Sequence, residues 1–171
     1  MACENCNCET PTLGIYGAKE LPKYHSLGAA CFDLEYHPNS TNLVKYFDEI
    51  TGYERVEYSQ YSLPIEPNRI YMLPTGLRFD IPNGYSVRIY PRSSTPIKYG
   101  LSLSNNTGII DSDYVDEIFL MMRSHRKCDL QVGTRLCQAE LVKVLQADFR
   151  LLQEAPGIKG NRSGGFGSTG L

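Results

Sequence analysis

From Tyr71 onward the sequence alternates short apolar runs with turn residues, and this regular spacing is the feature that most limits the fold. The run YMLPTGLRFDI is followed by a turn at Pro82, Asn83 and Gly84, and then by YSVRIY. Short strands at even intervals, separated by proline and glycine turns, are typical of closed barrels and double-sheet β folds. We therefore expect an all-β protein.

The chain is long enough for one such domain. It has 171 residues, of which 42% are hydrophobic and 21% charged, so it can bury a core of its own. The net charge is −2, and no overall positive field would attract nucleic acid or an anionic membrane. No apolar run approaches the roughly 18 residues of a membrane span, and the signal-peptide pattern is missing. We expect a cytoplasmic protein with neither nucleic acid nor membrane as a partner.

Residues 104–117, SNNTGIIDSDYVDE, contain the clearest candidate active site. The residues NNTG favour a tight turn and the two isoleucines favour a strand, so Asp111 would follow a strand of fixed geometry. A carboxylate held in this way can orient and deprotonate a water molecule. A hairpin that only exposes its aspartates to solvent would show the same local pattern.

Three other segments carry groups suited to phosphate. Arg92 precedes Ser93 and Ser94 at a strand end, where a guanidinium fork and two hydroxyls can form charge-assisted bonds. Gln138 lies in RLCQAELVKVL, whose periodicity fits strand or helix equally. The chain ends in NRSGGFGSTGL, whose arginine, hydroxyls and backbone N–H groups could close over phosphates while Phe166 stacks on a base. A frayed tail is the alternative.

The sequence before Tyr71 predicts a short strand after Thr12, a loop around Pro22, a second strand around Asp33 and one short helix. Phe32 and Leu34 flank Asp33 in an alternating pattern, which would place the carboxylate on the face opposite the apolar side chains. Within residues 38–62, helical spacing is shown by the apolar positions Leu43, Phe47 and Ile50. Since Gly52 follows, this spacing predicts a short helix.

The N-terminal cysteines allow two interpretations. Cys3, Cys6 and Cys8 could give zinc three soft ligands, but the segment offers no fourth. We therefore favour a disordered, cysteine-containing N-terminus over residues 1–11. The other cysteines are expected to be free thiols.

In order along the chain, five segments resemble the five motifs of the trimeric dUTPases: GAACFDL, PRSS, NNTGIIDSDY, GTRLCQAELV and RSGGFGSTG. The resemblance implies a jelly-roll-like distorted β barrel over residues 12–156, with the short helical insert at 38–62. It also implies a flexible glycine-rich C-terminal arm, residues 157–171, that closes over the active site.

The activity that the resemblance implies is that of a dUTP diphosphatase. Water would attack the α-phosphorus of dUTP and release dUMP and pyrophosphate, which keeps uracil out of DNA and supplies dUMP for thymidylate synthesis. The partners implied are dUTP, Mg²⁺ and two further copies of the chain in a homotrimer with shared active sites.

The resemblance also assigns a role to each matched residue. Asp111 would activate the water, and Tyr114 would pack against the deoxyribose so that no 2′-hydroxyl fits. Asp33 would contact the Mg-triphosphate indirectly, through water. The uracil would be read by the hairpin residues Asn105, Gly108 and Ile110, with Phe166 stacked on the base. The phosphates would be bound by Arg92, Ser93, Ser94, Gln138, Arg162, Gly167 and Ser168.

Two alternatives remain at this level. The dCTP deaminases share the fold and part of the motifs, but they need a glutamate on the strand after the aspartate, where this chain has Met121 and Met122. A regulator of low catalytic activity could instead keep the nucleotide site and bind a protein partner through the 38–62 insert.

Overall fold

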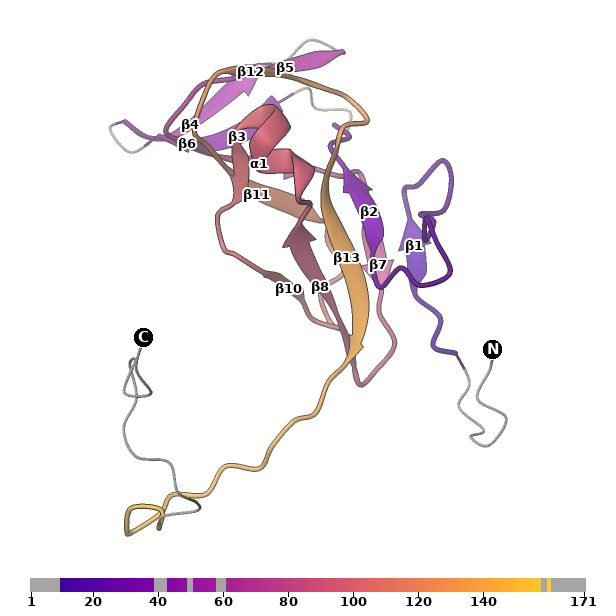
Figure 1. Cartoon of the computed structure of the whole chain (residues 1–171), viewed down its shortest axis with the longest axis vertical. Helices are drawn as coiled ribbons and strands as arrows, with labels where there is room; N and C mark the ends of the chain where they lie inside the picture. Colours follow the sequence, from indigo (N-terminus) through magenta and orange to yellow (C-terminus); the bar gives the residue numbers. More distant parts are fainter. Residues whose placement is uncertain (1–9, 39–42, 49–50, 58–60, 158–159, 161–171) are drawn as a thin grey trace.

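The computed structural model describes residues 10–38, 43–48, 51–57, 61–157 and 160, most of which form antiparallel strands and the turns between them (Figure 1). One sheet has the order β10–β8–β13–β2, with the bounds Gly108–Ile110, Tyr85–Pro91, Arg135–Lys143 and Phe32–Glu35. A second has the order β4–β3–β6–β11–β9, with the bounds Gly52–Glu57, Leu43–Asp48, Arg69–Pro74, Phe119–Ser124 and Leu101–Leu103. The remaining pairs are β1 with β7, Gly14–Tyr16 with Arg78–Asp80, and β5 with β12, Ser62–Ile65 with Cys128–Gln131.

The hydrophobic core joins the two larger sheets. Leu34 and Ile89 from the four-stranded sheet belong to the same buried cluster as Leu73 and Leu120 from the five-stranded sheet. β2, β6 and β11 contribute alternate residues to this cluster, as pleated geometry requires. The all-β, jelly-roll-like expectation is confirmed, although the sheets do not join into one closed barrel within the described residues.

The predicted helix in the insert is wrong. Residues 43–48 form β3, which pairs with β6 on one side and with β4 on the other. The helical spacing omitted Val44 and Tyr46, whose side chains are the buried ones, whereas Phe47 is exposed. Burial thus has a period of two, and the β-branched and aromatic residues suit a pleated surface.

One short helix is present in the described residues. It is α1, Ser94–Tyr99, directly after the PRS sequence, and the sequence analysis did not predict it. Arg126 closes its C-terminal end by donating from Nη2 to the carbonyls of Ile97 at 2.9 Å and Lys98 at 2.6 Å. Such bonds satisfy carbonyls that the helix itself leaves unpaired. No helix in the described residues is long and apolar enough to cross a membrane.

The remaining expectations concern the RLCQAELVK segment and the two ends of the chain. RLCQAELVK is a strand, β13, which settles the choice between strand and helix. The expected disorder of residues 1–11 and the zinc alternative for the N-terminal cysteines fall almost entirely outside the described residues, as does most of the C-terminal arm.

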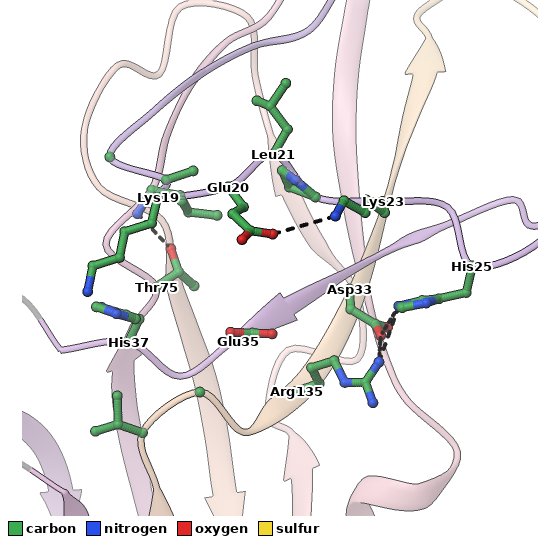
Figure 2. Close-up of a pocket in the computed structure, with 16 residues that line it drawn as sticks. Lys19, Glu20, Leu21, Lys23, His25, Asp33, Glu35, His37, Thr75 and Arg135 are labelled. Atoms are coloured by element: carbon green, nitrogen blue, oxygen red, sulfur yellow. Dashed lines mark hydrogen bonds and ion pairs between the residues drawn. The ribbon is translucent and has the colours of Figure 1, made fainter.

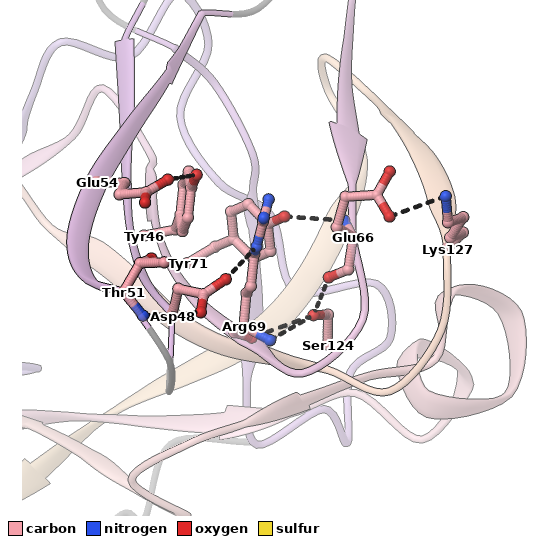
Figure 3. A network of polar contacts seen from close by, with 9 residues as sticks. All are labelled: Tyr46, Asp48, Thr51, Glu54, Glu66, Arg69, Tyr71, Ser124 and Lys127. Atoms are coloured by element: carbon pink, nitrogen blue, oxygen red, sulfur yellow. Dashed lines mark hydrogen bonds and ion pairs between the residues drawn. The ribbon is translucent and has the colours of Figure 1, made fainter.

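Arg69 connects the β3–β4 hairpin to the rest of the five-stranded sheet (Figure 3). Its Nε donates to Asp48 Oδ2 at 2.9 Å, and its guanidinium lies 4.4 Å from the ring centroid of Tyr46. Tyr46 in turn donates its hydroxyl hydrogen to Glu54 on β4, and this bond raises the pKa of Tyr46. One side chain therefore contacts an ion-pair partner and an aromatic face on β3.

We predict that Arg69→Ala lowers the free energy of unfolding by about 1–2 kcal/mol, because a partly buried ion pair and a cation–π contact are lost together. Urea denaturation measures the change. Arg55→Ala is the matched control, since Arg55 is exposed on β4, and it should shift stability by less than about 0.5 kcal/mol. Equal losses in the two variants would contradict the assigned role.

Candidate functional site

The turn between β9 and β10 carries Asn105, one of the expected uracil-reading residues, at an exposed position, and Asn106 adopts a left-handed conformation with φ of 58°. The expected hairpin is not formed, because β9 pairs with β11 and β10 pairs with β8. β9 is an edge strand of the five-stranded sheet and β10 of the four-stranded sheet, so this turn connects the two sheets. A Cβ on Gly108 would lie 3.1 Å from Ile89 Cβ, and this close packing leaves little room for any larger residue.

Asp111 follows β10 and is exposed. It lines a cavity of about 570 Å³ together with Ser112, Asp113, Tyr85 and other residues at this end of the sheet. The Tyr114 amide donates to the Asp111 carbonyl at 3.2 Å. This turn sets the tyrosine beside the aspartate.

A second group of polar side chains surrounds Asp33 on β2 (Figure 2). Arg92 Nε lies 3.0 Å from Asp33 Oδ1, and Arg135 Nη1 lies 3.1 Å from Oδ2. His25 Nε2 is 3.2 Å from the same Oδ2. The Asp33 side chain is only 14% exposed, and a buried charge needs a partner. The two guanidinium groups supply that compensation.

Gln138 and the serines lie next to this group. In the sheet, Gln138 is directly opposite both Asp33 and Tyr90, and its Nε2 donates to the Pro91 carbonyl at 3.2 Å. Ser93 precedes α1 and its hydroxyl makes no capping bond to the helix. Since it does not cap the helix, the Ser93 hydroxyl can contact a ligand.

The sequence analysis missed Arg135 and His25. A strict two-residue period would place Arg135 on the same face as Cys137, in the core. The register of β13 shifts between these residues, however, and two consecutive residues, Leu136 and Cys137, are buried. The bulge turns Arg135 to the Asp33 side. The position of Arg135 inside the GTRLCQAELV segment was the one sequence feature that could have marked it as a site residue.

Cys31 is not a nucleophile in this arrangement. Burial first, and then the carboxylates of Glu140 and Asp33, raise the pKa of its thiol. Since the thiolate is the reactive form, the thiol stays inert near neutral pH.

Within one chain, Asp111 and the Asp33 group lie at opposite ends of β8. Ile110 is opposite Val87, whereas Cys137, the neighbour of Gln138, is opposite Pro91. Val87 and Pro91 are four residues apart, or ~13 Å at ~3.3 Å per residue. The structure therefore brings Arg92, Ser93, Asp33 and Gln138 together, but it does not bring Asp111 to them.

The Asp33 group suits a metal ion that arrives with its own ligands. No cluster of three or more His, Cys, Asp or Glu side chains that could hold a metal occurs in the part of the chain that the structure describes. Both Asp33 oxygens already accept from arginines, but a carboxylate has further lone pairs for a water molecule. Mg²⁺ usually keeps several waters and binds through substrate phosphates, which agrees with a water-mediated contact.

The C-terminal residues expected at the site lie outside the described residues. They are Arg162, Phe166, Gly167 and Ser168.

Comparison with known proteins identifies the family. The dUTPase family model matches residues 56–170. The chain belongs to the dUTPase family. A deoxyuridine 5'-triphosphate nucleotidohydrolase of Dinoroseobacter shibae is 38% identical over 156 residues, covering 88% of this chain and 87% of that protein. One of Finegoldia magna is 32% identical over 152 residues, covering 88% and 91%.

Solved dUTPase structures have the same fold. A dUTPase from Streptococcus mutans superimposes with a TM-score of 0.60 at 25% identity, covering 80% of this chain and 99% of that one. A Staphylococcus bacteriophage 80alpha dUTPase with dUPNHPP gives a TM-score of 0.68 at 18% identity, covering 95% and 100%. The resemblance drawn from the five motifs is thus confirmed at the level of family and fold.

We predict that Asp33→Asn lowers the free energy of unfolding by about 1–2 kcal/mol, because the partly buried Arg92 and the more exposed Arg135 then lie close together without a counter-charge. Chemical denaturation measures it. Asp113→Asn is the control, as Asp113 is an exposed aspartate, and it should change stability by less than about 0.5 kcal/mol. An Asp33→Asn protein as stable as the wild type would show that the arginines do not need this carboxylate.

Proposed function

We propose that this dUTPase-family protein hydrolyses dUTP to dUMP and pyrophosphate by attack of water on the α-phosphorus. The observation that carries the proposal is the placement of Asp111, an exposed carboxylate at the end of a strand fixed in a sheet, beside a cavity. Such a group can hold a water molecule and accept its proton. The relatives named as deoxyuridine 5'-triphosphate nucleotidohydrolases support the substrate.

The β9–β10 turn, β10 and Tyr114 select the base and the sugar. Since β10 is an edge strand, some of its main-chain N–H and C=O groups face away from β8 and can bond to the uracil edge. Gly108 and Ile110 contribute these main-chain groups, and Asn105 adds its side-chain amide. Tyr114, 40% exposed, offers a ring face to the deoxyribose. A ribose 2′-hydroxyl would then collide with the ring.

The phosphates bind at the Asp33 group. Arg92 and Arg135 are oriented by Asp33, and Ser93, Ser94 and Gln138 add neutral donors. Mg²⁺ bound to the triphosphate supplies positive charge that offsets the charge developing on the phosphoryl oxygens. Arg162, Gly167, Ser168 and Phe166 complete the site from the C-terminal arm, residues 157–171.

We propose a homotrimer in which Asp111 of one chain faces the Asp33 group of another. The separation of these groups along β8 supports shared sites. The segment after β13 supports assembly, because it leaves the sheets in an extended path (Figure 1) and its large apolar side chains are exposed. Leu145 is 96% exposed and Phe149 100% exposed in the single chain. Apolar surface of this kind marks a contact with another chain.

A cytoplasmic location is part of the proposal. Cys31, Cys128 and Cys137 are free thiols in the described part of the chain. Unpaired cysteines are usual in reducing compartments. No observation among the described residues supports the regulator alternative.

The first functional prediction concerns the reaction. With Mg²⁺ present, pyrophosphate should be released from dUTP much faster than from dCTP, dTTP or UTP, and chelation of the metal should slow the release. Asp111→Asn should lower kcat by on the order of 10²-fold or more, because the general base is lost while binding groups remain. Ammonia release from dCTP would instead indicate a deaminase, and near-full turnover in the variant would remove Asp111 from this role.

The second functional prediction tests the shared sites. Asp111→Asn and Arg92→Ala proteins should each be nearly inactive. When equal amounts of the two are unfolded, mixed and refolded together, they should recover about a quarter of the wild-type activity. Random assembly joins an intact Asp111 to an intact Arg92 of another chain at that frequency. Light scattering confirms that each protein has the same assembly state. Mixtures without recovered activity would place both residues of a site in one chain.

A further inference from the structure

Tyr114 is held in place by hydrogen bonds through Glu117. The Tyr114 hydroxyl donates to the Glu117 main-chain carbonyl at 3.0 Å. The Glu117 side chain accepts, at Oε1, from the amide of Gly76 at 3.0 Å. We name these two bonds the Glu117 clamp. They connect the tyrosine ring to the turn between β6 and β7.

That turn is itself firmly held. Thr75 Oγ1 donates to the Ile118 carbonyl at 2.7 Å, and the Ile118 amide donates to the Leu77 carbonyl at 2.8 Å. Thr75 and Ile118 are buried. Gly76 has φ of 71°, a conformation that glycine adopts without strain, and this geometry supports the turn that presents its amide to Glu117.

The residues between Tyr114 and Glu117 give little support of their own. Val115 is 66% exposed. The Asp116 side chain is 79% exposed and lies 4.0 Å from Arg78, a separation typical of a weak surface ion pair. The Tyr114 ring is therefore held mainly through the Glu117 carbonyl, whose peptide group is anchored by the Ile118 amide and, through the Glu117 side chain, by the Gly76 amide.

We propose that Glu117 is a positioning residue for sugar discrimination, which it exerts by fixing Tyr114 through the Gly76 amide. This inference rests on the proposed function, because it concerns the choice between dUTP and UTP. Without the clamp, the ring can move and admit a 2′-hydroxyl.

The clamp needs a hydrogen-bond acceptor and not a negative charge. A glutamine side chain carries a carbonyl oxygen at the same distance from the backbone as Glu117 Oε1, and it can accept from the Gly76 amide. Alanine cannot. Comparison of Glu117→Gln with Glu117→Ala thus separates positioning from electrostatics, and Asp116→Ala is the control for loss of a neighbouring carboxylate.

The experiment measures kcat/KM for dUTP and UTP with Mg²⁺, together with the exchange rate of the Gly76 amide hydrogen without nucleotide. Glu117→Ala should lower the dUTP preference by about tenfold, in line with the loss of one hydrogen bond, and should speed Gly76 exchange. Glu117→Gln and Asp116→Ala should keep both. In a Tyr114→Ala background, Glu117→Ala should cause no further loss of preference, since both changes act through the same ring.

Unchanged preference in Glu117→Ala, an equal loss in Glu117→Gln, or additive losses with Tyr114→Ala would each overturn the inference. If the wild-type protein releases no pyrophosphate from dUTP, it is the proposed function that fails. The exchange rate of Gly76 in the same variants still decides whether Glu117 holds this loop.

Discussion

The position of β8 constrains the rest of the functional surface. It is paired to β13 along its whole length and to β10 over Val87–Ile89, so neither neighbour can slide without losing main-chain hydrogen bonds. The Asp33 group is thereby fixed at the Pro91 end and Asp111 at the Val87 end. A rigid sheet that separates two halves of a site also presents each half at a defined place, which is what a symmetric assembly needs in order to combine them.

The Asp33 carboxylate makes the proposed phosphate-binding group possible. Without Asp33, the positive charges of Arg92 and Arg135 would repel each other. Asp33 offsets this repulsion by accepting from Arg92 at Oδ1 and from Arg135 at Oδ2. A second contact, from Arg92 Nη1 to the Arg135 carbonyl at 3.2 Å, couples the two arginines through the main chain. The guanidinium groups are held before any triphosphate binds, and this preorganisation lowers the entropy lost on binding.

Much of the fold could be predicted because its strands alternate in an ordinary way, as around Asp33 and from Tyr71 onward. Prediction failed where local periodicity was misleading. In the insert, apolar residues occur on both faces of β3, so a helical pattern could be selected from them although the buried pair is Val44 and Tyr46. Arg135 lies in a segment whose periodicity did not separate strand from helix, so no face could be assigned to it, and the bulge that turns it toward Asp33 depends on pairing with β2 rather than on any local residue.

The separation of Asp111 from the arginines has a chemical consequence. An arginine in contact with a carboxylate stabilises its charged form and occupies its lone pairs, which makes the carboxylate a poorer base. No ion pair of the described residues involves Asp111, whereas Arg92 and Arg135 are already engaged by Asp33. In the proposed homotrimer, these arginines are already committed to Asp33, so they would bring positive charge to the phosphates without pairing with Asp111. The proposed base would then keep its lone pairs for a water molecule.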